Sequence, residues 1–135
     1  MKYEKSCGCV VFDEGKVLMI QHNEGHWDFP KGHVEGNETE IQTAIREVKE
    51  ETNIDVNVKS QNRYTIEYSP KDGVLKEVVY FIATKNSNEC KPQESEVQKV
   101  EWVRIEDAID RVTFDITRNV LKRAIGDIEK NGMEI

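Results

Sequence analysis

No apolar run in this sequence of 135 residues is long enough for a signal peptide or a membrane-spanning helix. Cysteines are also few: Cys7, Cys9 and Cys90 are odd in number, and they form neither a CxxC pair nor a disulfide framework. Cys7 and Cys9 alternate on an expected strand, which is typical of core thiols. We therefore expect a reduced, cytoplasmic protein with no membrane partner.

The chain has no excess of positive charge, and it is too short to form a second domain. Its formal net charge is −7, with 26 acidic and 19 basic residues. Sequence-independent nucleic-acid binding needs a basic surface, so we expect no nucleic-acid partner. No repeat, linker or low-complexity segment divides the chain. We predict a single domain over residues 1–135, acting as a monomer or homodimer.

Hydrophobic patterning predicts a sheet covered by helices on both faces. Residues 22–36 are rich in Gly and His and are expected to form a loop with a short strand at 27–29. Apolar residues occupy both faces of 74–84, which predicts a central, doubly covered strand. The other expected strands are 6–12, 16–21, 57–68 and 97–103, and the expected helices are 39–52, 105–111 and 114–130.

The helix predicted at 39–52 carries three acids on one flank, Glu47, Glu50 and Glu51. Like charges at this spacing repel, and acids near a helix C-terminus oppose the macrodipole. Clustered carboxylates are, however, the ligands that hard divalent cations select, and Mg²⁺ commonly joins them to substrate phosphates. The alternative is a solvated charged face stabilised by an Arg46–Glu50 pair.

The spacing around these acids resembles the Nudix box, Gly-x5-Glu-x7-Arg-Glu-apolar-x-Glu-Glu-x-Gly-apolar. Asn53 is the one departure, because the family has Gly there. A left-handed residue is expected just after the helix end, and Asn is the usual substitute for Gly in that conformation. The departure should cost little stability and leave the chemistry intact. The positions in register are Gly32, Glu38, Arg46, Glu47, Val48, Glu50, Glu51 and Ile54.

The resemblance implies the α/β Nudix sandwich, with helices on both sides of a mixed central sheet, and a divalent cation, Mg²⁺ or alternatively Mn²⁺. Glu47, Glu50 and Glu51 are the expected metal ligands, and either Glu50 or Glu47 is the expected base that takes a proton from water. Arg46 is expected to orient a carboxylate. The expected roles of Glu38 and Gly32 are less specific. Glu38 is either a catalytic acid or a simple N-terminal acid of the helix. The backbone at Gly32 is expected to pass close to metal or phosphate, and the carbonyl of Gly32 or that of Lys31 is expected to bind the ion.

Outside the box, the run from Trp27 to Glu35 is similar to that of asymmetrical diadenosine tetraphosphate hydrolases of the same superfamily. The similarity gives Lys31 a phosphate-binding role. It also suggests Lys76 as a phosphate contact unless it is a solvated strand residue. Other positions suggested in this way are Tyr68 and Tyr80 as substrate contacts, Glu96 as an additional metal ligand, and Phe114 as a base-stacking residue.

Some of these positions have a structural alternative. Tyr80 on a central strand and Phe114 at a helix start are more often core residues than ligand contacts. The three histidines, His22, His26 and His33, have no metal-ligand spacing with one another or with the cysteines, so no zinc site is expected.

The sequence therefore predicts a Mg²⁺-dependent hydrolase of phosphoanhydrides in small nucleotide substrates. The favoured substrate is a dinucleoside polyphosphate such as diadenosine tetraphosphate, giving ATP and AMP. Three alternatives remain open: a MutT-like nucleoside triphosphate pyrophosphohydrolase, an RNA 5′-pyrophosphohydrolase, which the acidic charge disfavours, and a non-catalytic nucleotide-binding Nudix module.

Overall fold

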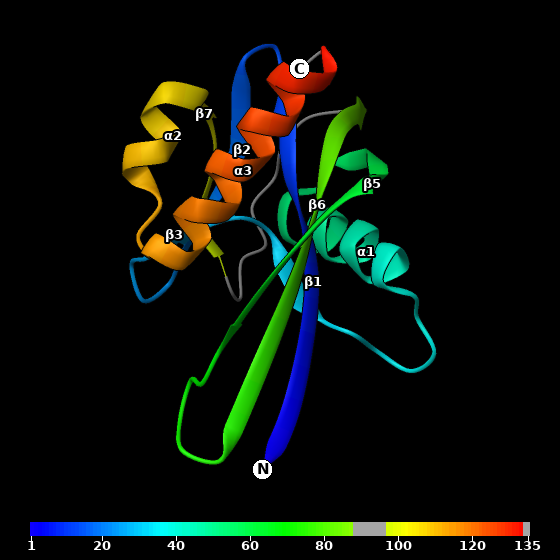
Figure 1. The fold of residues 1–135 in the computed structure, drawn as a ribbon, viewed down its shortest axis with the longest axis vertical. Coiled ribbons are helices and arrows are strands. Elements are labelled where there is room, and N and C mark those ends of the chain that lie inside the picture. Colours follow the sequence, from blue (N-terminus) through cyan, green and yellow to red (C-terminus); the bar gives the residue numbers. More distant parts are fainter. Residues whose placement is uncertain (88–96, 134–135) are drawn as a thin grey trace.

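A mixed β-sheet forms the centre of the molecule, in a computed structural model that describes residues 1–87 and 97–133 (Figure 1). Glu96 and Cys90 lie outside the described residues. In that described part, three helices accompany the sheet, α1 (Glu40–Thr52), α2 (Ile105–Arg111) and α3 (Asp115–Asn131). Its strands are β1 (Lys2–Asp13), β2 (Lys16–His22), β3 (Trp27–Asp28), β4 (Lys31–His33), β5 (Asp55–Tyr68), β6 (Val74–Ser87) and β7 (Val97–Arg104).

The main path of the sheet runs β3-β2-β1-β6-β5, with β4 paired to β1 and β7 paired to β2. β1 and β6 are parallel, from Lys2 opposite Val74 to Phe12 opposite Thr84, and the remaining pairs are antiparallel. The expected mixed sheet is therefore confirmed. β6 lies between β1 and β5, which also confirms the central strand predicted at 74–84.

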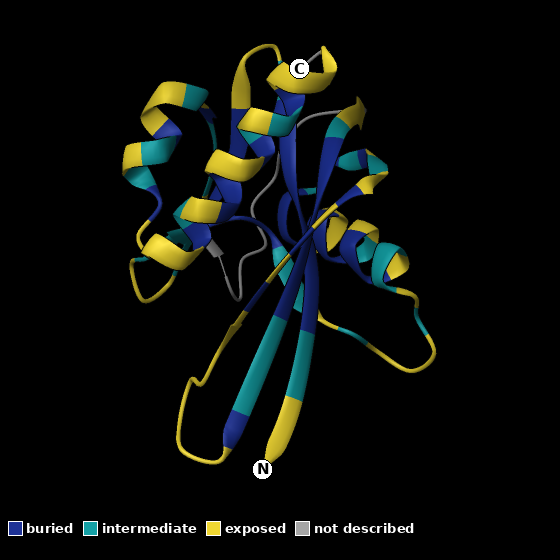
Figure 2. Ribbon diagram, viewed as in Figure 1, coloured by how far each residue is buried: buried dark blue, intermediate teal, exposed yellow. Residues whose placement is uncertain are grey.

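Two clusters of buried apolar side chains pack between the sheet and its helices. Figure 1 shows α1 and α3 on either side of the central strands, and Figure 2 shows buried residues along both helices. Alternate residues of β6 point to opposite layers: Tyr80 faces α3, and Phe81 faces α1. Cys7 and Cys9 are fully buried in the α1 layer, as predicted. Each buried aliphatic or aromatic side chain contributes roughly 1.5–3 kcal/mol of transfer free energy. The layer that contains Phe81 holds α1 against one face of the sheet, and the layer that contains Tyr80 holds α3 against the other.

The ends of α1 are fixed by local hydrogen bonds. At the start, the Thr39 hydroxyl accepts from the Gln42 backbone, and the Gln42 side chain accepts from the Thr39 backbone. At the end, Asn53 has φ 64° and donates its backbone N–H to the carbonyl of Lys49, which confirms the predicted left-handed cap.

In the described part of the chain, no helix is long and apolar enough to cross a membrane.

The segment 22–36 contains one strand more than predicted. β3 falls within the expected 27–29 strand, but β4 was expected to be loop. β4 pairs with the middle of β1, with Gly8 opposite Lys31. A Cβ on Gly8 would lie 2.0 Å from the Pro30 carbonyl oxygen, so glycine permits this close approach. The pairing fixes Lys31 and Gly32 beside the acids of α1.

Candidate functional site

Arg46 lies at the centre of the acidic cluster on α1. Its Nε and Nη2 donate to the two oxygens of Glu38, at 2.7 and 3.0 Å. Its Nη1 donates to Glu47 at 2.7 Å and to Glu50 at 3.2 Å, and Nη2 also donates to the backbone carbonyl of His33 at 2.9 Å. The planar guanidinium therefore fixes two of the three acids and ties them to β4.

Glu38 is occupied entirely by structural partners. Besides Arg46, it accepts hydrogen bonds from the hydroxyl of Thr43 at 2.9 Å and the backbone N–H of Glu35 at 3.0 Å. The hydrogen bond from Arg46 holds the pKa of Glu38 down to about 2. The arrangement indicates an ionised anchor that orients Arg46, rather than an acid that exchanges protons with a ligand.

Glu47 and Glu51 are carboxyl groups held in the interior, with 9% and 3% of their surface exposed. Burial raises the pKa of both, and the neighbouring charge of Glu47 helps to raise the pKa of Glu51 to about 9. The backbone N–H of Lys31 donates to Glu51 at 3.4 Å. Glu50 is exposed beside these two buried acids. The three carboxylates form an oxygen donor set that fits a hard divalent cation.

Gly32 explains how the acids approach β4 so closely. A Cβ at this position would lie 2.1 Å from Cδ and Oε1 of Glu47. Only glycine leaves room for the carboxylate at its present place. The backbone at Gly32 therefore passes close to the carboxylate of Glu47, and its expected approach to metal or phosphate stays a prediction.

A polar cavity of about 300 Å³ opens above these groups. Two lysines, Lys31 and Lys76, line it together with Glu47 and Glu50. Burial, and then the charge of Lys31, lower the pKa of Lys76, so the two ammonium groups are close enough to repel. An anionic ligand between them would relieve this repulsion. The cavity is lined by Ser6, Lys31, Gly32, His33, Glu35, Glu47, Glu50 and Lys76.

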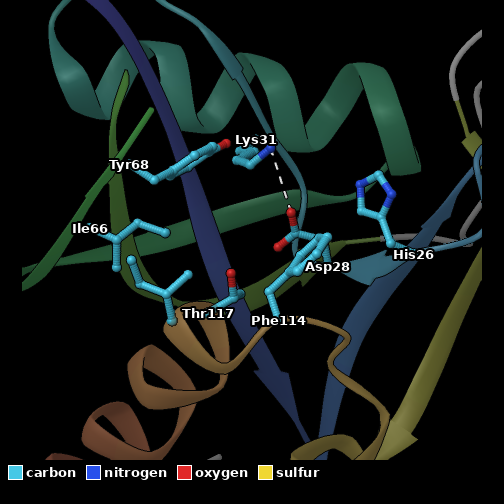
Figure 3. A pocket seen from close by; sticks show the side chains of 8 residues that line it. His26, Asp28, Lys31, Ile66, Tyr68, Phe114 and Thr117 are labelled. Atoms are coloured by element: carbon cyan, nitrogen blue, oxygen red, sulfur yellow. Dashed lines mark ion pairs between the residues drawn. The ribbon is translucent and has the colours of Figure 1, made fainter. Parts of the chain in front are cut away.

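A second cavity of about 300 Å³ lies beside the first and has mostly apolar walls. Figure 3 shows Tyr68 and Ile66 on one side, and Phe114 and Thr117 near the start of α3 on another. Phe114 is 50% exposed, so the structure places it on the cavity wall rather than in the core. Lys31 lines both cavities and thereby joins them; the other lining residues are His26, Asp28 and Ile116.

Tyr80 does not line either cavity, which corrects its assignment as a substrate contact. Its side chain is fully buried, because the central strand is covered on both faces. Its hydroxyl donates to Oδ1 of Asp28 at 3.0 Å, and Oδ2 of Asp28 lies 3.5 Å from Nζ of Lys31 (Figure 3). Asp28 was not among the predicted residues, although its position three residues before Lys31 was a signal that the two side chains could pair.

The structure brings together two of the histidines that sequence spacing had separated. The ligand atoms of His22, His26 and Asp28 all lie within 4.8 Å of one another. The imidazole rings of His22 and His26 stack with centroids 4.1 Å apart, and His26 lies 5.5 Å from the ring of Phe114. Spacing in the sequence gave no indication of this cluster because the histidines meet across a hairpin.

The fold and the acid-rich helix together define a class of enzyme. The chain belongs to the Nudix hydrolases: the NUDIX domain family matches residues 2–123. The resemblance of residues 32–54 to the Nudix box is thereby confirmed as family membership.

Among curated proteins, the chain is 36% identical to the asymmetrical bis(5′-nucleosyl)-tetraphosphatase of Caenorhabditis elegans, over 88% of this chain and 92% of that protein. It is 28% identical to the Sus scrofa protein of the same name, over 87% and 90% of the two lengths. Among solved structures, a C. elegans Ap4A hydrolase binary complex superposes with a TM-score of 0.84 at 30% identity, covering 94% of this chain and 98% of that one.

Proposed function

We propose that this protein is a cytoplasmic enzyme that hydrolyses dinucleoside polyphosphates, such as diadenosine tetraphosphate, to a nucleoside triphosphate and a monophosphate. One observation carries the proposal: an apolar cavity and a polar cavity adjoin, and Lys31 lines both. A nucleoside fits the first kind of surface and a polyphosphate the second. The names of the relatives from C. elegans and Sus scrofa support the same substrate class.

At the polyphosphate end, Glu47, Glu50 and Glu51 would hold Mg²⁺. The bound ion would lower the pKa of a water molecule and neutralise charge on the phosphates. Lys31 and Lys76, which line the same polar cavity, would bind phosphate oxygens.

The proton of the attacking water needs an acceptor near the mouth of the polar cavity. Glu50 lines that cavity, and its side chain is 47% exposed, whereas Glu47 and Glu51 are buried. Arg46 donates to both oxygens of Glu50 at 3.2 Å and so limits the orientations of the carboxylate. We assign Glu50 as the base on these grounds.

At the nucleoside end, the apolar cavity presents two exposed aromatic side chains, Phe114 and Tyr68. An aromatic face stacks on any base, with roughly 1–3 kcal/mol per stacked base. Ile66 and Ile116 add apolar surface. Recognition of this kind favours a nucleoside without selecting strongly among bases.

A substrate panel tests the proposal. The wild-type chain is incubated with Mg²⁺ and, separately, with diadenosine tetraphosphate, ATP, an oxidised deoxynucleoside triphosphate and triphosphorylated RNA, and the products are identified by chromatography. We expect diadenosine tetraphosphate to be consumed with the highest kcat/KM. Faster hydrolysis of free triphosphates would replace the proposal by a MutT-like activity, and tight binding without hydrolysis would indicate a regulatory module.

A further inference from the structure

The hairpin of β2 and β3 places three metal-binding side chains on one face. The register pairs Ile20 with Asp28 and Gln21 with Trp27, so the next pair is His22 with His26. A backbone hydrogen bond from His22 N–H to the His26 carbonyl, at 2.9 Å, closes this pair. Side chains alternate along a strand, so His26 and Asp28 share a face, and on that face His22 lies opposite His26 and diagonal to Asp28.

The imidazole of His22, at the centre of this face, has unused bonding capacity. Nε2 of His22 is buried and has no hydrogen-bond partner among the described residues. It lies 3.9 Å from Oδ2 of Asp28, too far for a hydrogen bond. A buried polar atom left unsatisfied costs about 1–3 kcal/mol, so the site favours an additional partner between the two atoms. Oδ1 of Asp28 is already taken by the Phe29 N–H and the Tyr80 hydroxyl, and Oδ2 also pairs with Nζ of Lys31 at 3.5 Å.

We propose that His22, His26 and Asp28 form a second divalent-cation site, separate from the acids of α1. Two imidazoles and one carboxylate select a borderline ion such as Zn²⁺ or Ni²⁺, and leave at least one position for water. Mg²⁺ prefers oxygen ligands and does not compete well for this set. The two sites therefore differ in the ions that they accept.

Binding requires one ring to turn. The His22 and His26 rings are only 15° from parallel, so in the stacked arrangement their lone pairs do not meet at one point. His26 is only partly buried in the hairpin loop and lines the apolar cavity next to Phe114, so its ring has room to rotate about its side-chain bonds. His22 and Asp28 supply the fixed part of the site.

The site is coupled to the apolar cavity by two shared residues. His26 lines that cavity, and Asp28 pairs with Lys31 at 3.5 Å (Figure 3). An ion on His26 and Asp28 would withdraw one side chain from the cavity wall and weaken the restraint on Lys31. The consequence is a higher KM for the nucleotide substrate in the presence of the ion.

The test is calorimetric titration of Zn²⁺ into the full chain, in saturating Mg²⁺ and without nucleotide. We compare wild type with H26Q and H22Q, and use H33Q as the matched control, because His33 is exposed and lies outside the cluster. We expect Zn²⁺ affinity to fall at least about tenfold in H26Q and H22Q and to stay unchanged in H33Q. Thermal unfolding verifies that each variant is folded, and H26Q alone carries the test if H22Q is not.

The variant E50Q separates this site from the acids of α1. The proposal requires that histidine-dependent Zn²⁺ binding persists in E50Q, whatever happens to hydrolysis there. Equal Zn²⁺ affinity in H26Q and H33Q, or loss of all Zn²⁺ binding in E50Q, would overturn it. Because the readout is ion binding, failure of the proposed cation site is distinguishable from failure of the proposed hydrolase activity.

Discussion

Replacing Gly32 by Ala should displace Glu47, a proposed metal ligand, without changing any charge. The new Cβ would lie 2.1 Å from Cδ and Oε1 of Glu47, whereas ordinary contact begins at 3.4 Å. The carboxylate must therefore retreat by about 1.3 Å, the difference between these distances. The 2.7 Å hydrogen bond from Arg46 would be stretched or broken. A misplacement of ~1 Å in an active site costs ~10²-fold in rate, so we expect kcat to fall by at least that factor.

Steady-state hydrolysis of diadenosine tetraphosphate, with Mg²⁺ titrated, measures the effect of G32A. Overpacking should cost about 1–3 kcal/mol, which thermal unfolding will report separately. G126A is the matched control, because Gly126 lies in α3 with nothing within 4 Å of the added Cβ. That variant should keep wild-type kcat and be slightly more stable. A folded G32A enzyme within threefold of wild-type kcat and Mg²⁺ affinity would refute the assigned role of Gly32.

Four further changes test other parts of the account. In the metal-free protein the pKa of Glu51 is raised from 4.5 to about 9. The protonated carboxyl of Glu51 therefore contributes its full stabilisation below pH 4.5, and this contribution is lost as the pH rises to about 9. The Tm should consequently fall less over this pH range in E51Q than in wild type. K76Q should raise KM ~10-fold or more by removing a charged phosphate contact, while K85Q, an exposed change on the same strand, should not. F114A should raise KM by ~5–100-fold, with kcat nearly unchanged, in the same assay. N53G should raise the free energy of unfolding in urea by ~0.5 kcal/mol without altering kcat, because the residue has φ 64°.

The parts of the molecule that sequence alone predicted are those set by local patterns. Helix α1 has an apolar stripe at helical spacing and a capping box, so its position and the common flank of Glu47 and Glu50 follow from residues within a few turns. The left-handed conformation at Asn53 is likewise a local consequence of the helix end.

Contacts between segments that are distant in the sequence could not be predicted from local patterns. Strand β4 has three residues with no apolar alternation, and it exists because β1 supplies its hydrogen bonds. The bond from Tyr80 to Asp28 joins residues 52 positions apart, so the sequence could not show that Tyr80 lies behind the cavity instead of on its wall. The pairing of His22 with His26 depends on a hairpin register that the predicted loop at 22–36 did not include.

The most direct test of the central claim compares wild type with E50Q on diadenosine tetraphosphate, with and without Mg²⁺. The account predicts that wild type forms equal amounts of ATP and AMP only when Mg²⁺ is present. It also predicts that E50Q, with an unchanged Tm, is slower by at least ~10²-fold. Hydrolysis that needs no divalent ion, or that continues at the wild-type rate in E50Q, would contradict the claim that the acids of α1 form the catalytic centre.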